Sequence, residues 1–310
     1  MISSFVSYHT PRSKAKKHWF AIALAVAVTL ATAFADDSPA DFEEDVDKTP
    51  ATGIDWPEFQ FAAADERGSG FRPNETFTYR AQWGIFKKAG VITIATEPTE
   101  NKQLMVKTTA NSKGFIRRLY PLTLEGKTTL DPENWRMVSN YVNGITRKEK
   151  SNSSSLFNYQ AGIMVHQNEA KPHRSGEKEI PHPIVLDYSA AFLQMRGWDL
   201  KIGEQYPLLV SSKGKFYYVE LEVKKTEKVK TYKGTTDAFV IEPIKAVPES
   251  KLFREGGAFT VWVSNDQERL PLMLEVKTKI GKATLRLESA EVNSGSIEAN
   301  DAANVANLTR

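Results

Sequence analysis

Short runs in which apolar and polar residues alternate recur along most of this chain, and they constrain its fold more than any other feature. In the run 76–83 the apolar residues Phe77, Tyr79, Ala81 and Trp83 are separated by polar ones. Side chains of a β-strand point alternately to its two faces, so this spacing predicts a strand with one apolar face. The same alternation recurs in 217–224, 259–263, 272–276 and 285–287.

Turn-forming residues separate these runs. Lys213-Gly214, Lys233-Gly234, Gly256-Gly257 and Gly281-Lys282 each stand between two strand patterns. Because parallel strands need long crossover connections, consecutive strands joined by tight turns predict an antiparallel meander. A sheet of this many strands must curl, split or close. We therefore expect a mostly β protein with a large curved antiparallel sheet, either an open barrel or a sandwich.

One segment departs from the strand pattern. Residues 187–196 read DYSAAFLQMR and contain neither glycine nor proline. Asp187 can cap the first backbone amides of a helix, and Gly197 suits a left-handed stop. Ala191, Phe192 and Met195 recur at helical spacing and would face the sheet. The sequence thus predicts one principal helix.

The first 35 residues are organised like a secretory signal peptide. A basic region from Arg12 to Lys17 precedes the apolar run 19–30, and Ala33 and Ala35 supply the small residues of a cleavage site. The run is shorter than the roughly 20 apolar residues of a transmembrane helix. We expect cleavage after Ala35, which places the chain in the periplasm or outside the cell without a transmembrane anchor. An uncleaved N-terminal anchor is the alternative.

The remaining chain divides into three parts by composition. Residues 36–55 hold eight acids and few large apolar residues, which predicts a disordered acidic linker. Residues 56–292 are expected to form a single β-rich domain, and 293–310 a disordered tail. Removing the signal segment and its four bases leaves 37 bases against 38 acids, or −1. This charge gives no support to nucleic-acid binding.

The residue types needed for several kinds of chemistry are missing. The chain has no cysteine, which excludes disulfides, thiolate nucleophiles and a lipid-attachment cysteine. It contains neither a Gly-x-Ser-x-Gly elbow nor a phosphate-binding loop. His173, Glu177, Glu179 and His182 share one polar segment, but their spacing fits no structural zinc site. We therefore expect no catalytic residue, no metal and no cofactor.

Two pairs of carboxylates offer an enzymatic alternative. Asp131 and Glu133 flank a proline, and Asp266 and Glu268 occupy a similar turn-like stretch. Two carboxylates can hydrolyse a glycosidic bond when they face each other across a cleft. Neighbouring carboxylates within one turn usually cap that turn instead.

Basic residues are interleaved with aromatic or apolar ones in two stretches, 114–122 and 223–234. The second contains Lys224, Lys225, Lys228, Lys230 and Lys233. On strands such a pattern forms a patch for lipid headgroups or an anionic envelope polymer. The alternative is a solvated strand face whose lysines discourage aggregation between sheet edges.

Three segments together resemble the bacterial envelope family known as domain of unknown function 3108. They are 71–94, 186–204 and 256–289, and the family pattern falls on Pro73, Glu75, Tyr79 and Trp83; on Asp187, Ser189, Arg196, Gly203 and Glu204; and on Trp262, Ser264, Asp266, Leu270 and Pro271. Asn74 replaces the expected glycine, and Ser189 follows Asp187 by two residues rather than three. The resemblance implies an exported β-rich protein with no established chemistry and no known cofactor.

These observations favour a non-enzymatic envelope module that binds an apolar or amphipathic ligand, or an envelope partner, in the concave side of its sheet. The two-sided apolar stretch 238–244 motivates a cavity. We expect Tyr79, Trp83, Val219 and Val261 to line it. The candidate ligand-binding residues are Tyr79, Trp83, Arg196 and Trp262. The alternatives are a glycan-acting hydrolase that uses the paired carboxylates and a structural scaffold with a packed core.

Overall fold

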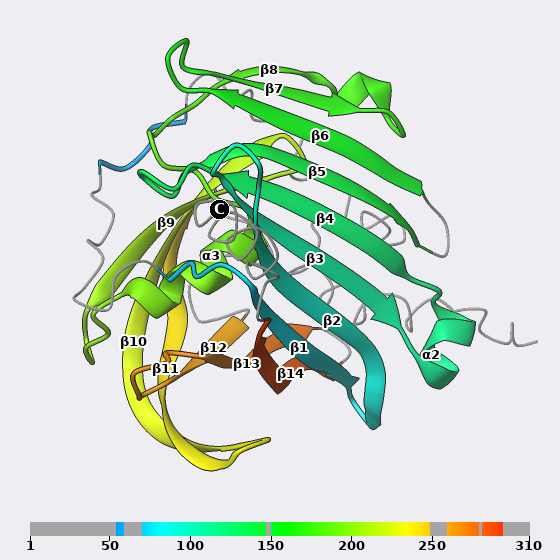
Figure 1. Ribbon diagram of the computed structural model, residues 1–310, viewed down its shortest axis with the longest axis vertical. Coiled ribbons are helices and arrows are strands. Elements are labelled where there is room, and N and C mark those ends of the chain that lie inside the picture. Colours follow the sequence, from blue (N-terminus) through cyan, green and yellow to red (C-terminus); the bar gives the residue numbers. More distant parts are fainter. Residues whose placement is uncertain (1–53, 59–69, 147–149, 249–258, 279–280, 294–310) are drawn as a thin grey trace, which may run out of the picture.

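The computed structural model describes residues 54–58, 70–146, 150–248, 259–278 and 281–293, and these form one sheet with short helices (Figure 1). The strands are β1 (Glu75–Trp83), β2 (Phe86–Pro98), β3 (Leu104–Ser112), β4 (Thr123–Leu130), β5 (Met137–Ile145), β6 (Lys150–Asn158), β7 (Ile163–Asn168), β8 (Gly176–Glu179), β9 (Gln205–Ser212), β10 (Lys215–Thr231), β11 (Gly234–Val247), β12 (Phe259–Ser264), β13 (Pro271–Thr278) and β14 (Gly281–Val292). The helical segments are α2 (Gly114–Leu119), η2 (Pro172–Arg174), α3 (Tyr188–Gln194) and η3 (Met195–Gly197).

The strands form two meanders joined side by side. Their spatial order is β8-β7-β6-β5-β4-β3-β2-β1-β14-β13-β12-β11-β10-β9. The two meanders are joined where β1, the first strand in the sequence, pairs antiparallel with β14, the last. The sheet curls without closing, which confirms the predicted curved antiparallel sheet and selects the open barrel over the sandwich. The predicted turn at Lys213-Gly214 has positive φ angles of 50° and 70°, the geometry of a tight hairpin.

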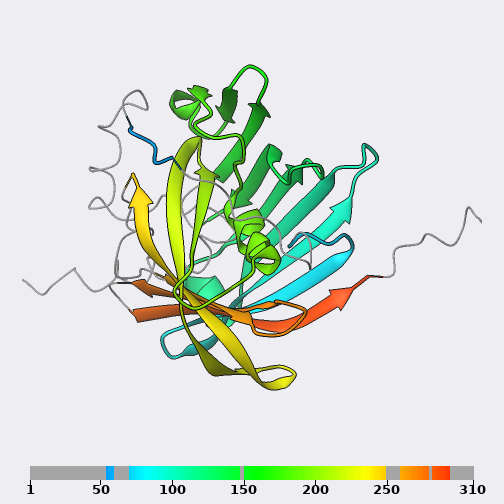
Figure 2. The ribbon, with the colours of Figure 1, turned by 90° about the vertical axis from the view of Figure 1, so that its left-hand side faces the viewer.

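The predicted helix is present and lies on the concave side of the sheet (Figures 1 and 2). Asp187 is the N-cap of α3, and its Oδ1 accepts a hydrogen bond from the backbone N–H of Ala190 at 2.8 Å. The predicted left-handed stop at Gly197 is wrong, because Gly197 has no positive φ. The chain instead tightens into η3, a common way for a helix to end.

The edge strand β9 approaches β5, in the other half of the sheet, through the connection that precedes α3. Leu186 forms a parallel bridge to Val210 in the edge strand β9. On the other side, the backbone N–H of Met137 in β5 donates to the carbonyl of Val185 at 2.9 Å. This short connection therefore lies between β9 and β5 where a closed barrel would have paired strands.

Strands β6 and β7 continue past this junction and cover the outer face of β9 and β10. Phe216 lies three residues before the inward-facing Val219 and therefore faces outward. Its ring meets that of Phe157 from β6, with centroids 6.4 Å apart. A Cβ added to Gly214, in the β9–β10 turn, would lie 2.6 Å from Cδ2 of His166 in β7. The sheet thus overlaps itself, and β9 is apolar on both faces for this reason.

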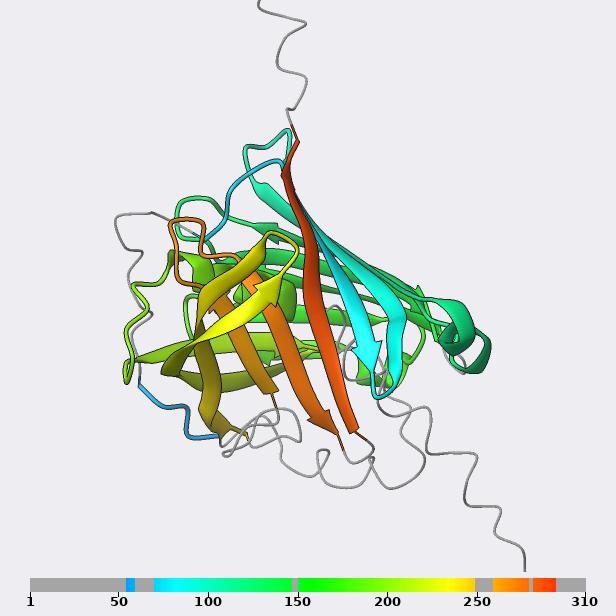
Figure 3. The same ribbon diagram turned by 90° about the horizontal axis from the view of Figure 1, so that it is seen from below.

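The β10–β11 hairpin makes a second overlap. β10 has 17 residues and β11 has 14, whereas β12 has only 6, so the hairpin projects beyond β12. It curls across the outer side of β12–β14 (Figures 2 and 3). All six residues of β12 are buried, because this strand is covered on both faces. The two-sided apolar stretch 238–244 belongs to the neighbouring strand β11, where residues 238–241 are likewise all buried.

Several sequence expectations concern residues outside the described ranges. They are the signal segment 1–35 with its cleavage site, most of the linker 36–55, the Gly256-Gly257 turn, and the tail beyond Asn293. The boundaries of the domain therefore stay predictions. Within the described part of the chain, the helices are too short or too polar to cross a bilayer.

Candidate functional site

A buried ion pair joins β1 to the turn that ends α3. Arg196 Nη1 lies 2.5 Å from Glu75 Oε2, and Nη2 lies 3.0 Å from Oε1, so the contact is bidentate. The two residues are only 1% and 5% exposed. The guanidinium also lies over the ring of Phe77 and donates to the carbonyl of Gly70 at 3.3 Å. Since an unpaired buried charge costs several kcal/mol, this pair fixes the end of α3 on β1.

The three segments that carry the family resemblance meet at this ion pair. Glu75 and Tyr79 belong to the first segment and Arg196 to the second. Backbone carbonyls of the third segment accept hydrogen bonds from the other two segments. Tyr79 Oη donates to the carbonyl of Pro271 at 2.9 Å, and Arg196 Nε donates to the carbonyl of Glu268 at 3.4 Å. The motif residues therefore hold β1, α3 and the β12–β13 connection together.

Polar side chains also fasten the start of α3 to the sheet. Asp187 Oδ2 accepts hydrogen bonds from Thr128 Oγ1 at 2.7 Å and from Asn140 Nδ2 at 3.3 Å. Thr108 Oγ1 donates to Ser189 Oγ at 2.8 Å. Burial raises the pKa of the Asp187 carboxyl, and the hydrogen bond from Thr128 opposes that rise. These contacts position the helix against β3, β4 and β5.

The residues expected on the concave face do lie there, inside a packed core. Tyr79 is fully buried, and its ring meets Phe192 of α3 edge-on at 5.7 Å between centroids. Burial raises the pKa of the Tyr79 phenol. Val219 and Val261 are each 1% exposed and belong to the same apolar cluster as the buried residues of α3. The helix thus occupies the concavity in which a ligand was expected.

The four candidate ligand-binding residues do not form one site. Tyr79 and Arg196 lie at the junction just described, and Trp83 lies at the end of β1 beside Phe86, with centroids 6.2 Å apart. Trp262 is on the opposite face of the sheet. Trp262 is paired with Met273, Met273 with Arg286, and Arg286 with Arg80 on neighbouring strands. Cross-strand partners share a face of the sheet, so Trp262 lies on the same face as Arg80. Trp262 Nε1 donates to Glu227 Oε1 of the overlying hairpin at 2.7 Å.

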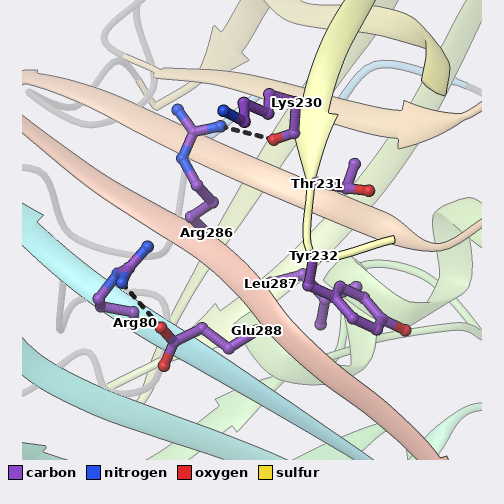
Figure 4. A pocket seen from close by; sticks show the side chains of 7 residues that line it. All are labelled: Arg80, Lys230, Thr231, Tyr232, Arg286, Leu287 and Glu288. Atoms are coloured by element: carbon purple, nitrogen blue, oxygen red, sulfur yellow. Dashed lines mark hydrogen bonds and ion pairs between the residues drawn. The ribbon is translucent and has the colours of Figure 1, made fainter. Parts of the chain in front are cut away.

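An open cleft lies between this hairpin and the outer face of β1 and β14 (Figure 4). Its volume is about 370 Å³, within the range of sites for small ligands. Basic, polar and apolar side chains all line it: Arg80, Lys230, Thr231, Tyr232, Arg286, Leu287 and Glu288. We call this space the outer cleft. It places three bases and one carboxylate near the aromatic ring of Tyr232.

The charges of the outer cleft are only partly neutralised. Arg80 Nη1 lies 3.0 Å from Glu288 Oε1, and Arg286 Nη1 donates to the carbonyl of Lys230 at 3.1 Å. The buried Nε of Arg80 has no hydrogen-bond partner among the described residues. Lys230 forms no ion pair within the described ranges, so the cleft keeps an excess of positive charge.

The lysines of the β10–β11 hairpin differ in their ion pairing along its length. Nearer its base, lysines are paired with carboxylates: Lys224 with Glu222 at 2.9 Å, Lys225 with Glu227 at 2.6 Å and Lys228 with Asp237 at 3.1 Å. Lys230 and Lys233, near the tip, have no such partner in the described part of the chain. The solvated-face interpretation therefore describes the base of the hairpin better than its tip.

In each pair of carboxylates, the aspartate accepts hydrogen bonds within its own turn. Asp131 Oδ1 accepts from the backbone N–H of Glu133 at 3.0 Å. Asp266 Oδ1 accepts from Ser264 Oγ at 2.7 Å and from the backbone N–H of Glu268 at 3.0 Å. These are the contacts of a capped turn, so they do not support the hydrolase hypothesis. Among the described residues, no three His, Cys, Asp or Glu side chains are grouped closely enough to hold a metal ion.

Sequence analysis did not identify the outer cleft. Arg80 and Arg286 occupy polar positions of alternating strands, where a base is an ordinary solvent-facing residue. The one available signal was the basic hairpin, which supplies Lys230. That signal does not say which strands the hairpin would cross.

Comparison with known proteins places the chain in an uncharacterised group. The sequence matches the family described as Protein of unknown function (DUF3108) over residues 78–288. The solved structure of a beta-barrel-like protein of domain of unknown function DUF1849 from Brucella abortus is 8% identical, covers 76% of this chain and 100% of that chain, and has a TM-score of 0.47. No curated protein matches the sequence.

Two further solved structures are more distant. A "putative exported protein with YmcC-like fold" from Bacteroides fragilis is 8% identical and covers 75% of this chain and 100% of that chain, with a TM-score of 0.27. A "putative lipoprotein" from Parabacteroides distasonis is 11% identical and covers 72% and 98%, with a TM-score of 0.28. All three TM-scores are below 0.5, so these likenesses carry no argument about this chain.

Proposed function

This chain belongs to the family described as Protein of unknown function (DUF3108), and from that premise we propose that it is an exported, non-enzymatic envelope protein that binds an anionic amphipathic ligand in the outer cleft. The signal segment supports export. The observation that carries the proposal is the combination of Arg80, Arg286 and Lys230 with the partly exposed aromatic ring of Tyr232.

The chemistry of the outer cleft favours a ligand with a carboxylate or phosphate group and an apolar part. Guanidinium groups bind such anions with charge-assisted hydrogen bonds, which are stronger than neutral ones. Arg80, Arg286 and Lys230 all line the cleft, so two guanidinium-bearing residues and one lysine lie around the space that a ligand would fill. The proposal keeps the ligand class expected from the sequence and moves the site from the concave face to the outer face.

A fluorescent anionic amphiphile, 11-(dansylamino)undecanoic acid, tests the proposal by titration, with its methyl ester as the uncharged comparison. We expect the acid to bind more tightly than the ester. Lys230→Gln should weaken binding of the acid about tenfold, because it removes a charged hydrogen-bond donor. Lys224→Gln is the matched control on the same hairpin, since Lys224 pairs with Glu222 outside the cleft. Equal binding of acid and ester, or equal effects of the two variants, would contradict the proposal.

A structural scaffold is the second candidate, and the packed core around α3 favours it. A scaffold would show no binding of either probe. Mass spectrometry of organic extracts from the natively expressed protein separates the two candidates independently, because a carrier retains its amphiphile during purification and a scaffold yields none.

A further inference from the structure

One end of the molecule exposes apolar side chains at two neighbouring places. Ile85, in the β1–β2 turn, is 88% exposed, and Phe115, in α2, is 56% exposed. Phe86 connects them: its ring stacks on that of Phe115 at 5.9 Å between centroids and lies 6.2 Å from that of Trp83. Figure 1 shows the β1–β2 turn and α2 next to each other at this end. We call this surface the basic tip, for the charges described next.

The exposed apolar groups are surrounded by positive charge. Five exposed bases belong to the same two segments: Lys87, Lys88, Lys113, Arg117 and Arg118. The stretches 81–95 and 106–123, which contain the whole tip, include no aspartate or glutamate. Elsewhere in the described chain, strand lysines such as Lys127 and Lys224 pair with nearby glutamates. The tip therefore carries an uncompensated local charge although the mature chain as a whole is nearly neutral.

The backbone holds the two segments in a fixed arrangement. The N–H of Lys113 donates to the carbonyl of Ala89 at 2.8 Å, which ties the start of α2 to β2. Gly84 has a φ of +51°, and its N–H donates to the carbonyl of Lys282 at 3.2 Å. The turn that presents Ile85 to solvent is thus anchored on β14. A large apolar side chain on an anchored turn, rimmed by bases, is typical of an interaction site.

We propose that the basic tip docks this protein onto a membrane surface rich in anionic lipid headgroups. A bilayer offers an apolar layer beneath a layer of anions, and the tip offers Ile85 and Phe115 surrounded by bases. Apolar side chains enter the boundary between headgroups and acyl chains, while lysines and arginines stay at the phosphates. Insertion of apolar side chains and attraction between bases and phosphates together produce stable membrane binding that neither provides alone.

The docking orientation brings the outer cleft towards the lipid surface. Figures 1 and 2 place the tip of the β10–β11 hairpin at the same end of the molecule as the β1–β2 turn. Arg80 lies three residues before Trp83, or about 10 Å along the strand. Tyr232, 41% exposed, belongs to the same end. The docking proposal nevertheless uses residues that do not line the cleft, so it stands or fails separately from ligand binding.

Vesicle sedimentation of the exported chain tests the proposal. We expect binding to vesicles of phosphatidylglycerol and phosphatidylethanolamine, no binding to vesicles of phosphatidylcholine, and release from the anionic vesicles by added salt. The double variant Lys87→Gln/Lys88→Gln should bind the anionic vesicles roughly thirtyfold more weakly, since each base near a charged surface contributes about fivefold. The matched control Lys102→Gln/Lys107→Gln removes the same charge towards the other end of β2 and β3 and should bind like the parent.

The apolar part of the proposal has its own variant. Ile85→Ser should weaken binding to the anionic vesicles several-fold. Because Ile85 is almost fully exposed, its replacement should leave the melting temperature unchanged, which circular dichroism checks. Absence of vesicle binding, or equal losses in the two double variants, would overturn the proposal. Binding to soluble polyglutamate that matches vesicle binding and ignores Ile85→Ser would also overturn it and would indicate an acidic protein partner.

Discussion

Two arginine–glutamate pairs lie on opposite faces of β1, and they show how differently the two sides of the sheet are used. The Glu75–Arg196 pair faces the concave side and is almost fully buried. The Arg80–Glu288 pair lies in the outer cleft, where its side chains are 29% and 40% exposed. The chemistry is the same, but water reaches only the second pair.

This difference in solvent access separates holding the fold from binding a ligand. A buried charge that loses its partner is strongly destabilising, so Arg196 is committed to Glu75. An exposed pair contributes about 0–1 kcal/mol to stability, so Arg80 is free to exchange its partner for an incoming anion. The concave side is therefore the structural side, and the outer side is the one with groups available to a ligand.

Arg196→Met is expected to have the largest effect. It leaves the Glu75 carboxylate buried without a partner, and the loss of unfolding free energy should be about 3–5 kcal/mol. Urea denaturation measures this loss. The double variant Glu75→Gln/Arg196→Met should recover part of it, because no buried charge is left unpaired. A loss below about 1 kcal/mol would show that the pair is solvated and that the two sides of the sheet do not differ.

Val261→Ala tests whether the concave side is packed. A void left in a filled core should cost about 1–3 kcal/mol of unfolding free energy, because the surroundings cannot fully collapse. Thermal unfolding compared with the parent gives the measurement. A cost well below 1 kcal/mol would reveal empty space beside Val261 and would restore the concave face as a ligand site.

Asp187→Ala removes the cap of α3, and the expected cost is about 0.5–2 kcal/mol with the fold intact. The loss arises because the N–H of Ala190 and the hydroxyl of Thr128 lose their acceptor. Asp187→Asn is the control, since asparagine still caps helices and should cost less. An unchanged melting midpoint in the alanine variant would contradict the capping role.

The interior should also respond to pH through His166. Burial lowers the pKa of His166, with a further contribution from Lys178. The folded state therefore binds this proton less readily than the unfolded state, whose imidazole titrates near pH 6.5. The contribution of neutral His166 to the free energy of unfolding is therefore complete above about pH 6.5 and declines as the pH falls below that value. Melting temperatures between pH 7.5 and 5.5 should fall less in His166→Gln than in the parent, and parallel profiles would argue against this group.

Arg80→Gln should have the smallest effect on stability, below about 1 kcal/mol, because its ion pair is partly solvated. The same variant should weaken binding of the anionic probe, since it removes a charged donor from the outer cleft. A combined measurement of melting temperature and probe affinity sharpens the contrast with Arg196. Large destabilisation without a change in affinity would place Arg80 among the structural residues.

Local sequence patterns predicted β1, β10, β12, β13 and β14, the turn at Lys213-Gly214 and the start of the helix. Period-two alternation depends only on neighbouring residues, so it is legible without knowing what each strand packs against. The cap at Asp187 and the turn at Lys213-Gly214 are local for the same reason. The family resemblance, carried by three separate segments, was confirmed by the match over residues 78–288.

Only the tertiary structure decided which of these residues share a site. Arg196 pairs with Glu75 across 121 positions of sequence, and Trp262 faces away from Tyr79 although both belong to apolar strands. The outer cleft exists because a long hairpin crosses β14, and the length of a strand pattern does not specify what it will cross. The physical reason is that alternation assigns residues to two faces of a strand, while the curl of the whole sheet decides which face is covered and by what.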